Sequence, residues 1–107
     1  MSEIPDINAV AMEVILNAGD GKMCIEHAFD SMAEFDFDAV EQHLKEAEEK
    51  VLKAHIAQTE TIQRQAAGED VEYSLLFTHA QDTLMTVSAE LHAVQRMVPV
   101  VRALASR

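Results

Sequence analysis

The chain has 107 residues and a formal net charge of −11, and 49% of its residues are hydrophobic. One domain is the default at this length, and only three glycines and two prolines leave little material for the turns of an all-β domain. The excess of acids argues against nucleic acid and anionic membrane surfaces as partners, because both are themselves negatively charged. We therefore expect a single helical domain over residues 1–107.

Other features of the sequence indicate a cytoplasmic protein. No apolar run approaches the roughly 20 residues of a membrane span, so we expect no membrane insertion. The N-terminus lacks the basic-then-apolar order of a secretory signal, and a single cysteine, Cys24, excludes an intrachain disulfide. Most acids precede residue 74, and only Asp82 and Glu90 follow it. A basic protein partner would be attracted to the acidic part, although a solvated acidic surface explains the pattern more simply.

A first helix is predicted from about Pro5 to Met32. Proline suits a first helical turn, where its missing N–H costs nothing. Gly19 and Gly21 predict a kink or break in the middle of the helix. Beyond them an apolar stripe continues through Met23, Ala28, Phe29 and Met32.

A second helix is predicted from about Asp38 to Ala67. Asp38, followed three residues later by Glu41, resembles a capping box with Asp in place of Ser or Thr. Apolar positions recur at spacings that mostly alternate between three and four, as in coiled coils. They are Phe37, Val40, Leu44, Ala47, Val51, Ala54, Gln58 and Ile62. The run Gly68-Glu69-Asp70 predicts a turn after this helix.

A third helix is predicted from about Ser74 towards the C-terminus, with a kink or early end at Pro99 because proline removes a backbone hydrogen bond. Its main apolar seam is Phe77, Ala80, Leu84, Val87, Leu91, Val94, Val98 and Val101. A second face of small or apolar residues lies nearly opposite, at Leu75, Asp82, Thr86, Ala89, Ala93 and Val100. A helix that is apolar on two faces needs cover on both, which favours association between copies of the chain. The alternative is that this helix is central in a compact bundle.

Asp82 lies in the middle of this second face. A buried, unpaired carboxylate is costly, so in an oligomer it would need a cation, a proton or hydrogen-bond donors. Copies of Asp82 that converge on a symmetry axis would share a metal ion. The alternative is that the face is partly wet and that Asp82 is solvated.

Five histidines are present. His43 and His92 fall on polar stretches and are expected to be ordinary surface residues. His27 follows Cys24 in a C-x-x-H spacing, but one Cys and one His are too few for a structural zinc site. His79 borders the main seam and the second face, one turn from Asp82 and near one end of the bundle. Its neutral imidazole is a competent nucleophile, although a histidine at a seam border is more often structural.

The segment His79-Ala80-Gln81-Asp82-Thr83-Leu84-Met85 closely resembles the H-[GA]-Q-D-H-L-M signature of the lactose/cellobiose-type enzyme IIA of the sugar phosphotransferase system. Asn17-Ala18-Gly19-Asp20-Gly21 is similar to the small, Gly-containing break in that family's first helix. Ala54-His55, followed by Gln58-Thr59-Glu60, looks like the family's A-H-x-x-Q-T-E stretch. The run Gln58-Thr59-Glu60 and the residue Ala80 look more like the cellobiose and chitobiose branch of the family than the lactose branch.

The resemblance implies an all-α fold, a three-helix antiparallel up-down bundle that assembles as a homotrimer. It implies a phosphotransferase component that accepts a phosphoryl group on His79, at Nε2, from the phosphocarrier protein HPr. The chain would pass the group to a sugar-specific enzyme IIB for uptake of a β-linked disaccharide. It also implies that Asp82 binds a metal ion, Mg²⁺, at the trimer axis.

The chain departs from the family pattern at three places. Thr83 stands where the family usually has a second histidine, Pro99 is unusual in the third helix, and the basic tail is reduced to Arg102 and Arg107. The missing histidine motivates an alternative, a non-catalytic regulatory or interaction bundle on the same scaffold. A metal-dependent enzyme built on His79, Asp82 and His55 is a further alternative, opposed by the absence of a Glu-x-x-His pair.

Overall fold

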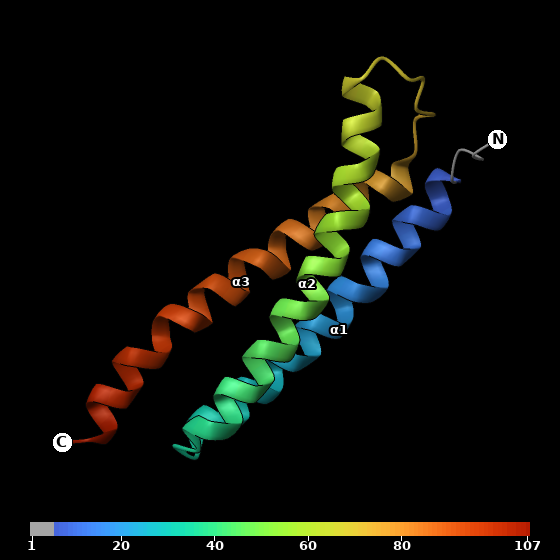
Figure 1. Cartoon of the computed structure of the whole chain (residues 1–107). Helices are drawn as coiled ribbons and strands as arrows, with labels where there is room; N and C mark the ends of the chain where they lie inside the picture. The colour runs from blue at the N-terminus through green and yellow to red at the C-terminus, as the bar shows by residue number, and fades with distance from the viewer. Residues whose placement is uncertain (1–5) are drawn as a thin grey trace.

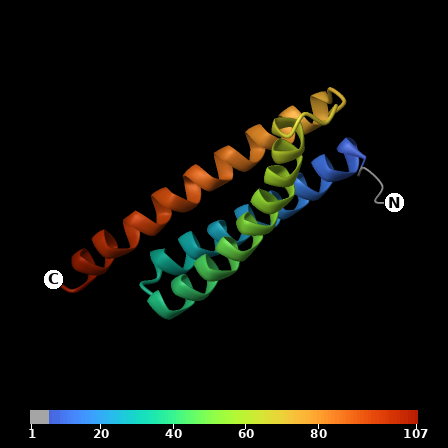
Figure 2. The same cartoon turned by 45° about the horizontal axis from the view of Figure 1, so that its top comes forward.

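Residues 6–107 are described by a computed structural model, and they form three long helices (Figure 1). In chain order these are α1 (Ile7–Ala33), α2 (Phe37–Ala66) and α3 (Leu75–Ala105). The helices run up, down and up along a body of 59 × 24 × 19 Å (Figure 2). The predicted all-α, three-helix architecture is confirmed. None of the helices in this part of the chain has both the length and the apolar character needed to cross a membrane.

Each helix begins at a side-chain cap. Asp6 accepts a hydrogen bond from the amide of Asn8, and Ser74 accepts one from the amide of Phe77. Asp36 caps α2 through the amide of Ala39 at 3.2 Å, so the predicted cap at Asp38 is wrong. Asp38 lies inside the first turn, where its charge is favourable at the helix N-terminus. The predicted start at Pro5 lies outside the described residues.

The predicted break in α1 is wrong, because the helix is continuous from Ile7 to Ala33. Gly21 is buried against α2, and a Cβ built there would lie 3.2 Å from Val51 Cγ2. Gly19 is exposed, with no neighbour within 4 Å of such a Cβ. Packing against α2 therefore outweighs the low helix propensity of the two glycines, about 1 kcal/mol each.

The predicted early end at Pro99 is also wrong, because α3 continues through it to Ala105. Pro99 lies on the exposed side of the helix. At an exposed position the proline ring meets no neighbouring helix, and water can replace the one backbone hydrogen bond that is lost. The predicted turn at Gly68 is confirmed, with a φ of 91° that favours glycine.

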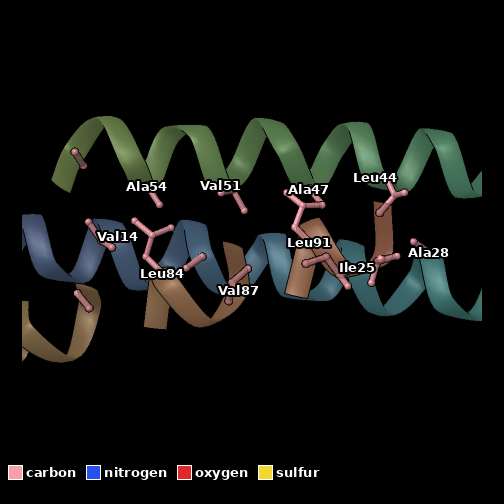
Figure 3. Packing of buried hydrophobic residues seen from close by; sticks show 14 of the residues in the cluster. Val14, Ile25, Ala28, Leu44, Ala47, Val51, Ala54, Leu84, Val87 and Leu91 are labelled. Atoms are coloured by element: carbon pink, nitrogen blue, oxygen red, sulfur yellow. The ribbon is translucent and has the colours of Figure 1, made fainter. Parts of the chain in front are cut away.

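The core is a narrow seam of small and medium apolar side chains between the helices (Figure 3). The α3 seam is confirmed, with Phe77, Val98 and Val101 partly buried at its two ends. Its fully covered residues are Ala80, Leu84, Val87, Leu91 and Val94.

Two predicted seams need correction. In α2 the seam is confirmed from Val40 to Ala54, but beyond it Ala57 and Thr61 are buried in place of Gln58 and Ile62. Thr61 lines a hollow together with Ile7 and Val10 at the start of α1. In α1, Met23 and Phe29 are exposed. The residues that face the core there are Val14, Ala18, Gly21, Ile25, Ala28 and Met32.

We predict opposite effects for the two glycines of α1. Gly19→Ala should stabilise the protein by about 0.5–1 kcal/mol, because alanine favours the helix and meets open space. Gly21→Val should destabilise it by about 1–3 kcal/mol, because the added methyl groups would push Val51 away. Urea unfolding followed by circular dichroism at one protein concentration measures both. Equal effects of the two substitutions would contradict the packing described here.

Candidate functional site

His79 lies in the first two turns of α3 and is exposed. Its neighbours Ala80 and Leu84 point into the core and are fully buried, so the helix turns position 79 outward. The Ser74 cap fixes the start of the helix four residues earlier. The imidazole is therefore carried on a rigid element and is open to a partner.

The histidine opens onto a hollow of about 280 Å³ between α1 and α3. Lys22 of α1 lines it together with residues of α3, which are His79, Asp82, Thr83, Thr86 and Val87. The hollow is shallow and open to solvent, which suits the approach of another protein better than the enclosure of a small molecule.

The two threonines of the hollow donate their hydroxyl protons to the backbone. Thr83 Oγ1 donates to the carbonyl oxygen of His79 at 2.9 Å, and Thr86 Oγ1 donates to that of Asp82 at 2.9 Å. In this arrangement Thr83 does not orient the ring of His79. Its hydroxyl oxygen keeps lone pairs, but its proton is already used.

Lys22 is the one cation among the residues that line this hollow. Its ammonium lies 3.5 Å from Glu90 Oε2 in α3, and the side chains are 51% and 30% exposed. Sequence reasoning missed Lys22. Its position in a different helix leaves no spacing signal that links it to His79.

The second face of α3 is exposed along its length in the protomer. Leu75 is 71% exposed and Val100 59%, and Asp82, Ala89 and Ala93 between them are exposed as well. The alternative in which the other helices of the same chain cover this face is therefore wrong. The ion pairs within 4.0 Å in the described part of the chain join Lys22 to Glu90, Lys50 to Asp20 and Arg102 to Glu41, and none includes Asp82.

His55 lies away from the hollow, where its Nε2 is 3.1 Å from Ser88 Oγ. This half-buried contact joins α2 to α3. The structure thus does not bring His55 to the residues that line the hollow with His79 and Asp82. Across residues 6–107, no group of three His, Cys, Asp or Glu side chains is placed to hold a metal ion.

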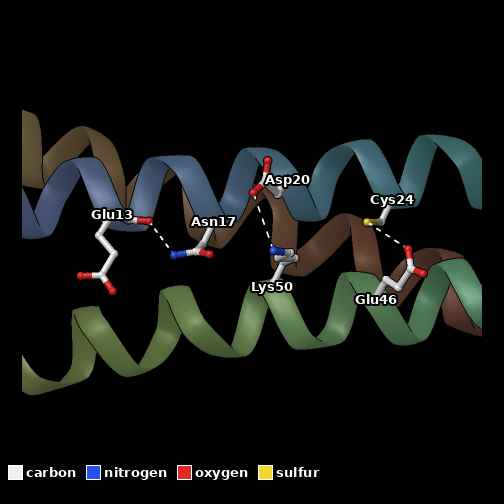
Figure 4. Close-up of polar contacts among 6 residues, drawn as sticks. All are labelled: Glu13, Asn17, Asp20, Cys24, Glu46 and Lys50. Carbon is white, nitrogen blue, oxygen red and sulfur yellow. Dashed lines mark hydrogen bonds and ion pairs between the residues drawn. The ribbon is translucent and has the colours of Figure 1, made fainter.

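Cys24 and His27 of α1 face α2, where Glu46 and His43 lie opposite them. Cys24 Sγ is 4.0 Å from Glu46 Oε2, and the rings of His27 and His43 are 5.4 Å apart (Figure 4 shows the first pair). Burial raises the pKa of the Cys24 thiol, and the carboxylate of Glu46 raises that pKa further. The prediction that His43 is an ordinary surface residue is wrong, since it is half-buried with its Nδ1 unpartnered.

A second hollow of about 280 Å³ lies between the start of α1 and the α2–α3 loop. Asp6, Val10, Arg64 and Glu69 are among its lining residues, and no histidine or cysteine lines it. It therefore lacks a strong nucleophile, and the hollow at His79 is the better candidate site.

Comparison with known proteins places the chain in a class. Residues 9–102 match the family model described as "PTS system, Lactose/Cellobiose specific IIA subunit". The chain belongs to this family of phosphotransferase-system components.

Individual relatives agree. The lactose-specific EIIA component of Staphylococcus epidermidis is 36% identical over 81 residues, which cover 76% of this chain and 78% of that protein. The lichenan-specific enzyme IIA component of Bacillus subtilis is 36% identical over 80 residues, 75% of this chain and 73% of that protein.

Solved structures share the fold. The cellobiose-specific enzyme IIA of Bacillus anthracis superposes with a TM-score of 0.89 at 26% identity, over 98% of this chain and 96% of that one. The chitobiose IIA in the Escherichia coli IIA–HPr complex superposes with a TM-score of 0.81 at 24% identity, over 95% and 99% of the two chains.

Proposed function

We propose that the chain is a phosphoryl carrier, which accepts a phosphoryl group on His79 from HPr and passes it to a sugar-specific enzyme IIB. The observation that carries this proposal is an exposed imidazole on a rigid helix, in an open hollow that also contains a cation. The signature segment around His79 and the family membership support the same reading. The proposal places the chain in the cytoplasm, where it would serve a permease that takes up a β-linked disaccharide.

Transfer needs a positioned nucleophile and neutralisation of the charge on the transferred group. The lone pair of the neutral His79 ring, at Nε2, attacks phosphorus from the side opposite the donor atom. The bond from phosphorus to the donor atom breaks, and its electron pair stays on the donor. The second step is the reverse of this one, with the group leaving His79 for the enzyme IIB. Positioning and neutralisation of charge supply most of the catalysis in such transfers.

Charge supports HPr as a partner of this chain, provided that the partner presents a basic surface. The net charge of −11 would attract such a surface and speed the encounter. The E. coli relative with the same fold was solved as a complex with HPr.

The same proposal includes a homotrimer built through the second face of α3. That face is exposed and rich in small residues, which allow helices to approach closely. Three Asp82 carboxylates on a shared axis would repel each other, and a hard cation such as Mg²⁺ fits their oxygen donors. Asp82 would hold the ion, and the ion would supply neutralising charge in a structural role.

The alternative is a non-catalytic bundle that keeps this scaffold. Thr83 supports this alternative, because its hydroxyl donates a hydrogen bond to the carbonyl oxygen of His79. The side chain therefore does not take the place of a second histidine ring. Assembly without phosphoryl transfer would favour this alternative.

The proposal predicts that His79→Ala abolishes labelling. Incubation with phosphoenolpyruvate, enzyme I and HPr should add one acid-labile phosphoryl group per wild-type chain and none to the variant, because the accepting nitrogen is gone. His92→Ala is the matched control, since His92 is another exposed histidine of α3. It should be labelled normally. Full labelling of His79→Ala would remove this residue from the mechanism.

The proposal also predicts that metal stabilises the trimer through Asp82. Sedimentation should give three times the 11.9 kDa chain mass. A chelator should lower the melting temperature of the wild type, whereas Asp82→Leu should be insensitive to it, because the leucines need no cation. Asp30→Leu, at an exposed position of α1, should keep the wild-type response. A monomeric wild type, or equal responses of all three proteins, would contradict the shared metal site.

A further inference from the structure

We propose that Lys22 is the counter-ion of the phosphorylated site: its ammonium leaves Glu90 and pairs with the phosphoryl group on His79. This inference rests on the proposed function and assigns a role to a residue outside the signature segment. The juxtaposition that suggests it is a lysine of α1 in the same hollow as the histidine of α3.

The position of Lys22 is fixed by the packing of α1. Its neighbours Gly21 and Ile25 are buried against the other helices. The absence of a side chain at Gly21 brings α1 close to α2 at this level. Lys22 points instead towards α3, where it contacts Glu90 and lines the hollow with His79 and Thr83.

The charge of the hollow explains why a counter-ion is needed. Phosphorylation adds about −1.5 to −2 charges at neutral pH. Asp82 lines the hollow and Glu90 stands beside Lys22, so the group would enter surroundings that already contain acids. Lys22 is the one cation among the lining residues. An opposite charge at this point favours the transferred group, as in other phosphoryl-transfer sites.

The present pairing of Lys22 allows the exchange. The ammonium and the Glu90 carboxylate are 3.5 Å apart, and about half of the lysine side chain is exposed. A lysine ammonium on its flexible stem changes partner readily. A dianionic phosphoryl group attracts it more strongly than a single carboxylate at the same distance. Glu90 thus holds the ammonium at the C-terminal side of the hollow while His79 is free, and the exchange moves the ammonium along α3 towards His79 when the group arrives.

The competing explanation is that Lys22 and Glu90 form a surface ion pair that only joins two helices. The chain offers a matched control, because Lys50 and Asp20 form a similar pair at 3.9 Å between α2 and α1 (Figure 4). Neither residue lines the hollow at His79. Removal of the Lys50–Asp20 pair therefore tests whether the loss of any ion pair between helices is enough to slow phosphoryl transfer.

The test compares Lys22→Gln, Lys22→Arg and Lys50→Gln in the phosphoenolpyruvate, enzyme I and HPr assay. Lys22→Gln should slow labelling at least about tenfold, because the charge that stabilises the transferring group is lost. Lys22→Arg should stay within about threefold of wild type, since the positive charge remains. Lys50→Gln should match the wild type. Glu90→Gln should raise the labelled fraction at equilibrium, because Lys22 then has no competing partner.

A ³¹P NMR titration of the labelled protein adds a readout that a structural role would not move. Loss of Lys22 should shift the titration midpoint of the phosphoryl group to higher pH, because a nearby cation favours the dianion. Lys50→Gln should leave the midpoint unchanged. If Lys22→Gln keeps the wild-type labelling rate and titration midpoint, the role of Lys22 is overturned. The same holds if Lys22→Gln and Lys50→Gln lose labelling rate equally. Neither result affects the proposed carrier function. A wild-type chain that accepts no phosphoryl group would overturn the proposed function instead.

Discussion

The structure depends on the two faces of α3. One face buries Leu84, Val87 and Leu91 against α1 and α2, and this burial sets the rotation of the helix about its axis. Because the rotation is fixed, the opposite face, with Asp82 at its centre, must lie outside the protomer. His79 sits at the border between the two faces, which leaves its ring exposed while its backbone is held by the core. The proposed carrier and trimer functions both follow from this one constraint.

The candidate site is made by two helices that have different tasks. The third helix supplies the candidate nucleophile, His79, and the carboxylate of Asp82, and the first supplies the cation Lys22. The buried Gly21 next to this lysine ties its position to the α1–α2 contact. A change in the packing of α1 would therefore alter the charge balance of the hollow without touching the signature segment.

The sequence predicted the α3 seam and the turn at Gly68, because periodicity and a positive-φ glycine are local signals. The predicted break at Gly19 and Gly21 and the predicted early end at Pro99 are wrong, because both helices continue through these residues. Local propensity was outweighed by packing at Gly21 and tolerated at the exposed Pro99. His79 was predicted as the nucleophile from the single signature segment that begins with it. Lys22 was missed because its relation to His79 exists only after α1 and α3 pack together.

The most direct test of this account is to identify the modified ring by NMR of protein with ¹⁵N-labelled histidines. The five imidazoles give separate long-range ¹H–¹⁵N correlations, which respond to protonation and to phosphorylation of each ring nitrogen. After addition of phosphoenolpyruvate with catalytic amounts of enzyme I and HPr, only the Nε2 of His79 should show the change. Modification of any other histidine, or no change in any ring, would contradict the account.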